Sequence, residues 1–317
     1  MGSSSLVSIV IPCFNAESFI AEAIESALGQ SYPNVEVVVV DDGSTDSSLA
    51  VVKSFGDRVR WYTGPNLGGC AARNRGVQMA RGELIQFLDS DDLLCPDKLK
   101  VQVPLALQSP DDVTYCDYEA RDFESGKQCR IHSAESRGLD PVEFVLLSQR
   151  LQTSAPLHER DRLLEMGGFR EGLSCAQEYD LHLRLACSGA RFLHVPEVLH
   201  VVRQRRGSVS SNSMRVIDQH KQILLEAWES LAQAGKLTDR ISASFAGILA
   251  TDARVYIRNQ QYDRACHYFQ LAAKLHENGG LDRAYSAPVR WLRSIVGAVN
   301  VERFVSSKRR LMGNVVS

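Results

Sequence analysis

Several features are absent from this sequence, and each absence excludes a class of protein. No uninterrupted apolar run reaches the roughly 18 residues that a spanning helix needs, so no transmembrane segment is predicted. The N-terminal stretch 1–12 lacks the charged start of a signal peptide, which indicates a cytoplasmic protein. The formal net charge is only -2, so nothing in the overall charge attracts nucleic acid or an anionic membrane.

Metal and disulfide patterns built on cysteine are absent as well. Eight cysteines are scattered along the chain without a CxxC pair and without the Cys/His spacing of a zinc site. We interpret them as reduced, packed thiols that carry no catalytic role.

What is present is an alternation of strand and helix patterns. The 317 residues, 44% of them apolar, are enough for one large α/β domain and an appended segment. Short runs rich in Val and Ile predict strands over 6–12, 35–40, 59–63 and 83–88. Apolar residues at helical spacing predict helices over 16–30, 45–55 and 68–80. This order predicts a mostly parallel sheet flanked by helices.

The second predicted strand ends on two adjacent carboxylates, Asp41 and Asp42, followed by Gly43 and Ser44. In sheets of this kind ligands lie beyond the carboxyl ends of the strands, so these carboxylates are candidate ligand contacts. The alternative is a tight turn followed by a helix cap at Ser44 or Thr45.

A second acidic cluster follows the strand at 83–88 and contains Asp89, Asp91 and Asp92. An Asp-x-Asp at a strand end suits Mg²⁺ or Mn²⁺, which take carboxylate oxygens and share other positions with phosphates. Neither GxxxxGK[ST] nor GxGxxG occurs, so a bound diphosphate would be neutralised mainly by metal. Helix capping by Ser90 or Asp92 is the alternative, but two acidic strand ends on one sheet favour a ligand site.

Between the two clusters, Gly68 and Gly69 precede a predicted helix whose early residues include Arg73 and Asn74. A helix N-terminus with a nearby guanidinium favours an anionic group. Either Arg73 or Arg75 could equally be a solvated surface charge.

Residues 7–48 and 66–92 together resemble the family 2 glycosyltransferases with the GT-A fold, and the likeness extends to about residue 210. The resemblance implies a GT-A (Rossmann-like) mixed, mostly parallel sheet over 1–213, with a nucleotide-sugar half at about 6–110 and an acceptor half at about 111–213. It also implies an inverting transfer of a sugar, most often UDP-linked, to an acceptor hydroxyl. The expected setting is bacterial polysaccharide or glycoconjugate assembly, with a glycan or lipid-linked acceptor.

The resemblance also assigns donor and metal contacts. Asp42 is expected to accept a hydrogen bond from the uracil N3–H, and Asp91 is expected to hold a divalent cation, Mn²⁺ or Mg²⁺, together with Asp89. The full set of donor contacts is Pro12, Phe14, Asn15, Glu17, Asp41, Asp42, Arg73, Asn74, Asp89, Ser90 and Arg205.

The acceptor half departs from the family pattern. Relatives usually carry an acidic EDxD-like stretch whose second acid is the base, whereas this chain has Gln177, Glu178, Tyr179 and Asp180. Glu178, or failing it Asp180, is the expected catalytic base, because a glutamate can perform the same proton transfer. The alternative is that these carboxylates are merely solvated at a helix start.

A second departure is Arg205, which stands where relatives often carry a histidine. A permanent cation can bind the diphosphate leaving group but cannot ligate a metal. Arg203, Arg205 and Arg206 as a solvated charge run is the alternative.

The C-terminal region, 214–317, has long helical patterns. Residues 253–275 have the spacing of one tetratricopeptide-like helical hairpin, expected to pack on its neighbours because a single unit cannot bury its own face. Residues 290–311 form a basic, amphipathic segment that could contact the inner face of a membrane peripherally. The alternative is that its apolar side closes the helical tail. The sequence does not predict an oligomeric state.

Three other functions are alternatives to this transfer. A nucleotidyltransferase would normally show a Gly-rich, Lys/Arg-bearing loop after the first strand, where this chain has PCFNAES. A catalytically degenerate scaffold gains weight from Gln177 and Arg205. A processive polysaccharide synthase is disfavoured, because no membrane channel and no QxxRW-type segment can be found.

Overall fold

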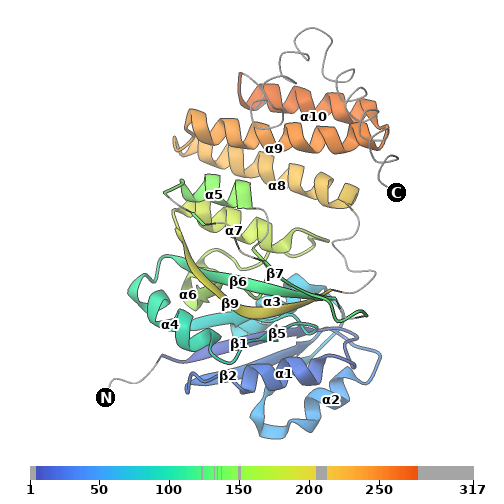
Figure 1. Ribbon diagram of the computed structural model, residues 1–317, viewed down its shortest axis with the longest axis vertical. Helices are drawn as coiled ribbons and strands as arrows, with labels where there is room; N and C mark the ends of the chain where they lie inside the picture. Colours follow the sequence, from blue (N-terminus) through green and yellow to red (C-terminus); the bar gives the residue numbers. More distant parts are fainter. Residues whose placement is uncertain are drawn as a thin grey trace. The chain divides into compact units, whose positions relative to one another are not determined.

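The computed structural model describes residues 5–122, 124–131, 133, 135–136, 138–148, 151–204 and 213–277. The chain divides into two compact units, Met1–Ser211 and Asn212–Ser317, each of which is described by itself (Figure 1). Arg205 and the basic segment 290–311 lie outside the described residues.

One mixed sheet forms the centre of the first unit. Its strands follow the order β3-β2-β1-β4-β8-β6-β9-β5, and β7 pairs with β6. Strands β1 to β4, β6 and β9 run in one direction, while β5, β7 and β8 run against them. The bounds are β1 Val7–Cys13, β2 Val35–Asp41, β3 Arg60–Thr63, β4 Leu84–Phe87, β5 Leu93–Leu94, β6 Val113–Asp122, β7 Gln128–Ile131, β8 Leu157–Glu159 and β9 Phe192–Gln204.

Helices flank this sheet, so the predicted fold class, a mostly parallel α/β sheet with a helical C-terminal extension, is confirmed (Figure 1). The helices of the first unit are α1 Ile20–Leu28, α2 Ser48–Ser54, α3 Gly69–Met79, α4 Lys98–Gln108, α5 Pro141–Ser148, α6 Arg160–Glu165 and α7 Gln177–Ser188, with a short 3₁₀ turn at Gly56–Arg58. The three helices predicted in the first hundred residues correspond to α1, α2 and α3, each shorter than predicted at its N-terminal end.

Alternation along β1 sends its side chains into two different cores. Ile9 and Ile11 join a buried cluster with Ile20 and Ile24 of α1, which covers one face of the sheet. Val10 points to the other face, where α3 crosses so closely that a Cβ on Gly76 would collide with it. A glycine is therefore needed at this position, and α3 is pressed against the strands that carry the site.

The described part of the second unit, 213–277, contains the helices α8 Ser213–Gln233, α9 Asp239–Arg258 and α10 Tyr262–Leu275. The Asp218 carboxylate of α8 accepts hydrogen bonds from the hydroxyls of Tyr256, at 2.7 Å, and Tyr268, at 3.1 Å. These bonds tie α8 to the hairpin of α9 and α10. Within the residues that the structure describes, no helix is both long and apolar enough to cross a membrane.

Candidate active site

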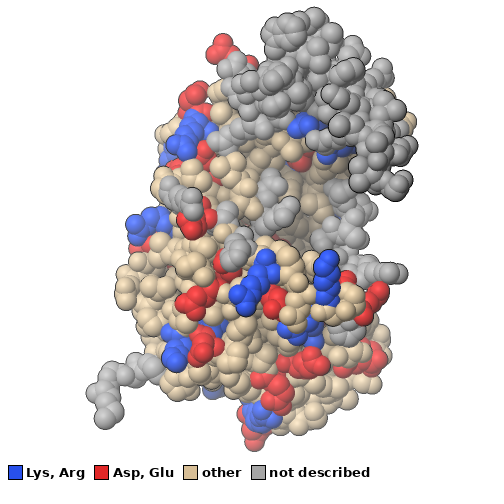
Figure 2. All heavy atoms as spheres, viewed as in Figure 1, with Lys and Arg blue, Asp and Glu red and all other residues tan. Residues whose placement is uncertain are grey.

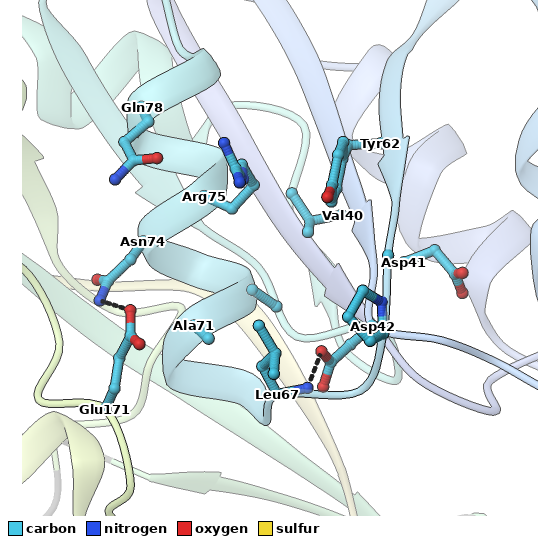
Figure 3. A pocket seen from close by; sticks show the side chains of 13 residues that line it. Val40, Asp41, Asp42, Tyr62, Leu67, Ala71, Asn74, Arg75, Gln78 and Glu171 are labelled. Atoms are coloured by element: carbon cyan, nitrogen blue, oxygen red, sulfur yellow. Dashed lines mark hydrogen bonds between the residues drawn. The ribbon is translucent and has the colours of Figure 1, made fainter.

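Asp41 and Asp42 lie where β2 ends, and because successive strand residues point to opposite faces, the two carboxylates serve opposite sides of the sheet. Asp41 accepts the Thr63 hydroxyl at 2.6 Å. Asp42 accepts the backbone N–H groups of Leu67, at 2.8 Å, and Gly68, at 2.9 Å, at the start of α3. Figure 3 shows Asp42 directed at Leu67, with Asp41 pointing away from it. Both carboxylates therefore hold turns, and only Asp42 faces α3.

A pocket of about 230 Å³ opens beside Asp42 (Figure 3). The Arg75 guanidinium carbon lies 4.9 Å from the centre of the Tyr62 ring at this pocket. The pocket residues of α3 recur at the three- and four-residue spacing that marks one helix face. Arg73 does not fit that spacing, so it lies on the opposite face of α3. The lining residues are Val40, Asp41, Asp42, Tyr62, Gly64, Pro65, Leu67, Ala71, Ala72, Asn74, Arg75, Gln78 and Glu171.

Two of the predicted donor contacts after β1 connect it to the loop after β2. The Asn15 side-chain oxygen accepts the Thr45 N–H at 2.8 Å, and the Glu17 carboxylate accepts the Ser47 N–H at 2.9 Å. Asn15 also has a positive φ of 48°, a conformation that asparagine tolerates better than most residues. These side chains therefore fix the shape of the strand ends.

The other predicted contacts in this part of the sheet are more accessible. Pro12 and Ser90 are half-buried, and the Phe14 side chain is 49% exposed at the end of β1. An exposed aromatic face beside polar strand ends can stack on a planar ring.

Arg73 is the centre of a cluster of charged and polar side chains. Its guanidinium donates to the Asp89 carboxylate at 2.6 Å and to the Gln177 side-chain oxygen at 2.8 Å, and it lies 3.8 Å from the Glu178 carboxylate. The guanidinium carbon also lies 5.2 Å from the centre of the Phe169 ring. Burial lowers the pKa of Arg73, but the charges of Asp89 and Glu178 outweigh burial and raise it above its usual value. Arg73 therefore joins the acidic loop after β4 to the start of α7 as a fixed cation.

Arg203 of β9 anchors the acidic loop. The Arg203 side chain donates to the Asp91 carbonyl oxygen and to the Glu22 carboxylate, and its backbone N–H donates to the Asp92 carboxylate at 2.9 Å. Burial and the nearby charge of Asp89 raise the pKa of Asp92 well above its usual value, despite the Arg203 N–H. Asp92 is thus a buried carboxyl that is tied to the backbone of β9.

The half-exposed carboxylates of Asp89 and Asp91 remain as the donor set for a cation. Two carboxylates that leave room for water and phosphate oxygens fit the way in which Mg²⁺ is usually bound. Nowhere in the described ranges do three or more His, Cys, Asp or Glu side chains gather as a metal site, so a cation here would need ligands from substrate or water.

The two candidate bases at the start of α7 have different surroundings. Glu178 is 28% exposed and accepts the Thr153 hydroxyl at 2.8 Å. Asp180 is fully buried, with Arg170 at 3.0 Å and Arg184 at 2.9 Å from its oxygens. Only Glu178 faces the Arg73 cluster and is open to a substrate.

Asn74 makes contacts that its predicted donor role did not anticipate. Its side-chain oxygen accepts the Phe169 N–H at 2.8 Å, and its side-chain nitrogen donates to the Phe169 carbonyl at 2.8 Å and to Glu171 at 3.1 Å. A Cβ on Gly168 would collide with the same amide, so this loop packs directly on α3. Asn74 therefore holds the loop that leads to α7.

Sequence reasoning missed the parts played by Thr153, Phe169 and Gln177 around this centre. Gln177 was read only as the loss of an acid, although an amide oxygen can still accept from an arginine. Thr153 could not be identified from the sequence, because it lies in a loop without a motif. It contacts Glu178 in the folded structure, although the two residues are far apart in sequence. Arg205 lies outside the described residues.

Comparison with known proteins identifies the family. The profile described as Glycosyl transferase family 2 matches residues 8–161. An uncharacterized glycosyltransferase of Rickettsia typhi is 33% identical over 281 residues, covering 85% of this chain and 84% of the relative. The chain belongs to glycosyltransferase family 2. The transferase is also 35% identical over 221 residues to the glycosyltransferase GlyG of Streptococcus pneumoniae, covering 65% of this chain and 73% of GlyG.

Solved structures show that the fold is shared with this transferase at low sequence identity. TarS 1-349 from S. aureus, in complex with UDP-GlcNAc, aligns with a TM-score of 0.71 and 17% identity, covering 96% of this chain and 92% of that one. The mannosyltransferase PcManGT from Pyrobaculum calidifontis, in complex with GDP-Man and Mn²⁺, aligns with a TM-score of 0.59 and 18% identity, covering 96% and 84%. The GT-A fold expected from the sequence is thereby confirmed.

Proposed function

We propose that the transferase moves a sugar, with inversion, from a nucleotide-diphosphate sugar of the UDP class to an acceptor hydroxyl. The observation that carries this proposal is the Arg73 cluster, in which one buried cation contacts Asp89 of the acidic loop and lies beside Glu178 of α7. Leaving-group stabilisation and proton removal need such neighbouring groups. The complexes of TarS with UDP-GlcNAc and of PcManGT with GDP-Man support a nucleotide-sugar donor, and the TarS complex favours the UDP class.

In the proposed reaction Glu178 acts as the general base. Its carboxylate takes the proton of the acceptor hydroxyl while the hydroxyl oxygen attacks the anomeric carbon. The bond from that carbon to the diphosphate oxygen breaks, and the electron pair leaves with the nucleotide diphosphate. Attack from the face opposite the leaving group inverts the anomeric configuration.

Asp91, with Asp89, would hold Mn²⁺ or Mg²⁺, which when bound supplies positive charge for the departing diphosphate. Arg73 is placed by its own contacts to add a second positive charge, and it needs no proton transfer to do so. We propose Arg205 as a further cation for the leaving group.

The nucleoside would lie over the ends of β1 and β2. Phe14 offers an exposed ring face for the base, and Asp42 offers a carboxylate. Each carboxylate oxygen has more than one lone pair, so Asp42 can accept a uracil N3–H while it holds Leu67 and Gly68. Pro12, Asn15, Glu17 and Ser90 would shape this subsite.

We propose a cytoplasmic role in polysaccharide or glycoconjugate assembly, on a glycan or lipid-linked acceptor. Eight free thiols, of which Cys129 and Cys266 are exposed, fit a reducing compartment. Figure 2 shows acidic and basic side chains intermingled over the described face of the first unit. A nucleic acid would need a continuous basic surface, so the visible face favours a neutral or locally charged acceptor instead.

A donor screen tests the proposal. The purified full chain is heated with UDP-GlcNAc, UDP-glucose, UDP-galactose or GDP-mannose, each with Mn²⁺, with Mg²⁺ and with EDTA. We expect the melting temperature to rise with UDP-sugars only when a cation is present, because ligands that bind the native state stabilise it. Nucleotide release is then measured with the donor that gives the largest shift. The absence of any shift and any release with the UDP-sugars would refute the proposed donor class.

A further inference from the structure

We infer that Thr153 is a positioning residue that holds the catalytic base by a hydrogen bond from a rigid, buried turn. This inference rests on the proposed role of Glu178. The Thr153 hydroxyl donates to Oε1 of Glu178 at 2.8 Å, and Thr153 itself is buried.

The two oxygens of Glu178 are used differently. Oε1 receives the Thr153 hydroxyl and also faces the Arg73 guanidinium at 3.8 Å. Oε2 has no hydrogen-bond partner among the described residues, and the side chain is 28% exposed. The geometry leaves Oε2 as the oxygen that takes the acceptor proton, while Oε1 keeps the carboxylate in place.

The turn that carries Thr153 is anchored by buried polar groups. The Ala155 N–H donates to the Gln152 carbonyl at 3.0 Å and closes the turn. Gln86 of β4, itself fully buried, donates to the Ser154 carbonyl at 3.0 Å.

Two buried side chains of α4 hold the last residue of this turn. The Lys98 ammonium group lies 2.9 Å from the Ala155 carbonyl, and the Gln102 side-chain nitrogen lies 3.2 Å from it. Both side chains are fully buried. Lys98 also donates to the Gln102 side-chain oxygen, so the two buried side chains form one connected anchor for the turn that carries Thr153.

A hydrogen bond donated to a carboxylate stabilises its charged form. Arg73 and the Cys70 thiol, one turn before Arg73 on α3, also act on Glu178. The carboxylates of Asp89, Asp180 and Glu171 act on these same two groups. Burial raises the pKa of Cys70 to about 11, so this thiol is neutral near pH 7. Loss of the Thr153 hydroxyl should therefore shift the protonation of Glu178 toward higher pH, with Arg73 still in place.

The test compares Thr153→Val, which keeps the shape and removes the donor, with Thr153→Ser, which keeps the donor. With UDP-GlcNAc and Mn²⁺, Thr153→Val should lower kcat by about tenfold or more, leave donor affinity unchanged, and move the acidic limb of the kcat profile to higher pH. Thr153→Ser should restore most of the rate. In a Glu178→Gln background, Thr153→Val should have no further effect, because the group that it positions is gone.

A second measurement does not depend on turnover. Protein labelled with ¹³C at the glutamate carboxyl carbons is titrated by NMR, and the Glu178 signal is the one missing in Glu178→Gln. Its titration midpoint should rise in Thr153→Val and return in Thr153→Ser, whereas a loss of stability alone would not move it. An unchanged midpoint overturns the inference. Full activity in Glu178→Gln would instead refute the proposed base, so the two failures can be told apart.

Discussion

Gln177 stands where family relatives usually carry an acid, yet its side-chain oxygen accepts from Arg73 at 2.8 Å. The amide keeps the acceptor and removes a charge, so among the described residues Asp89 and Glu178 are the carboxylates that pair with Arg73. Gln177 also weakens the interpretation of the domain as a catalytically degenerate scaffold, because the buried cluster around Arg73 keeps its hydrogen bond at this position. A degenerate site would be expected to lose such contacts.

The base assignment can be tested by comparing two carboxylates on the same helix. Glu178→Gln should lower kcat by at least about 10²-fold with donor affinity nearly intact, because an amide cannot take the proton. Asp180→Asn should instead cost about 2 kcal/mol of folding stability, because it leaves Arg170 and Arg184 without their buried carboxylate. Turnover and thermal melting, measured for both variants, separate a loss of catalysis from a loss of stability. Near wild-type turnover in Glu178→Gln would move the role to Asp180.

The metal assignment concerns Asp91. A neutral amide is a poor ligand for a hard cation, so Asp91→Asn should lose most of the gain in UDP affinity that Mn²⁺ gives the wild type. Calorimetry with and without Mn²⁺ measures this gain, and Asp97→Asn, at an exposed carboxylate five residues from the acidic loop, is the matched control. UDP binding that depends equally on Mn²⁺ in Asp91→Asn and in the wild type would show that the cation is held elsewhere.

At the scale of elements, the acidic loop depends on a link between β9 and α1. Arg203, near the end of β9, donates to the Asp91 carbonyl and to Glu22 of α1, and its guanidinium carbon lies 5.1 Å from the centre of the Phe19 ring. The antiparallel pairing of β5 with β9 brings this arginine to the loop. Two elements distant in sequence thus fix the backbone that presents the Asp91 side chain.

Arg203→Met should therefore weaken UDP binding in Mn²⁺ by about tenfold, because the loop loses its side-chain anchor while its carboxylates stay intact. Glu22→Gln should have a smaller effect in the same direction. Arg121→Met, at the half-exposed Arg121–Glu119 pair of β6, is the control. If Arg203→Met folds normally and binds UDP with Mn²⁺ as the wild type does, the loop does not need this anchor.

Of the four strands that the sequence predicted, β1, β2 and β4 are mostly buried and rich in apolar residues, whereas β3 is mostly exposed. The run 35–40 is nearly all valine, and it became the buried strand β2. The antiparallel strands β5 and β8 have only two and three residues, too short for any periodic signal, and they exist because their partners in the sheet hold them. The long parallel pair of β6 and β9 was not predicted, because the residues of β9 at Pro196 and Glu197 interrupt the strand pattern at a register shift.

The site divides in the same way. Asp41, Asp42 and Asp89 were candidates because a carboxylate at a strand end is a local signal, whereas Glu178 was named through the family resemblance. Contacts such as Thr153 with Glu178, or Asn74 with Phe169, join residues that are far apart in sequence. Nothing local specifies them, so the sequence could name candidate groups but not the residues that orient them.

At the scale of the whole molecule, the chain combines a transferase unit with a helical unit. The second unit buries Ala253, Ala265 and Ala272, three of the small residues on which the hairpin prediction rested. Asp218 of α8 joins this hairpin through Tyr256 and Tyr268, which fits a packing role within the unit. Its resemblance to a tetratricopeptide repeat stays a prediction.

The last prediction is that the basic segment 290–311 attaches the whole molecule to an anionic membrane. It combines apolar residues, Trp291 among them, with six cations that only Glu302 offsets: Arg290, Arg293, Arg303, Lys308, Arg309 and Arg310. Each cation near an anionic surface contributes on the order of 1 kcal/mol, and an interfacial tryptophan adds apolar burial. Such contact would bring the enzyme to a lipid-linked acceptor.

Full-length protein should therefore sediment with vesicles rich in phosphatidylglycerol and stay in solution with phosphatidylcholine alone. High salt should release it, since screening weakens attraction between charges at a surface. A chain truncated after Ser286 should not sediment, and a full-length variant with Lys308, Arg309 and Arg310 changed to Gln should bind more weakly, because it keeps the apolar residues and loses half of the positive charges. If the full-length chain stays in the supernatant with anionic vesicles at low salt, membrane contact is wrong and the segment serves the helical unit instead.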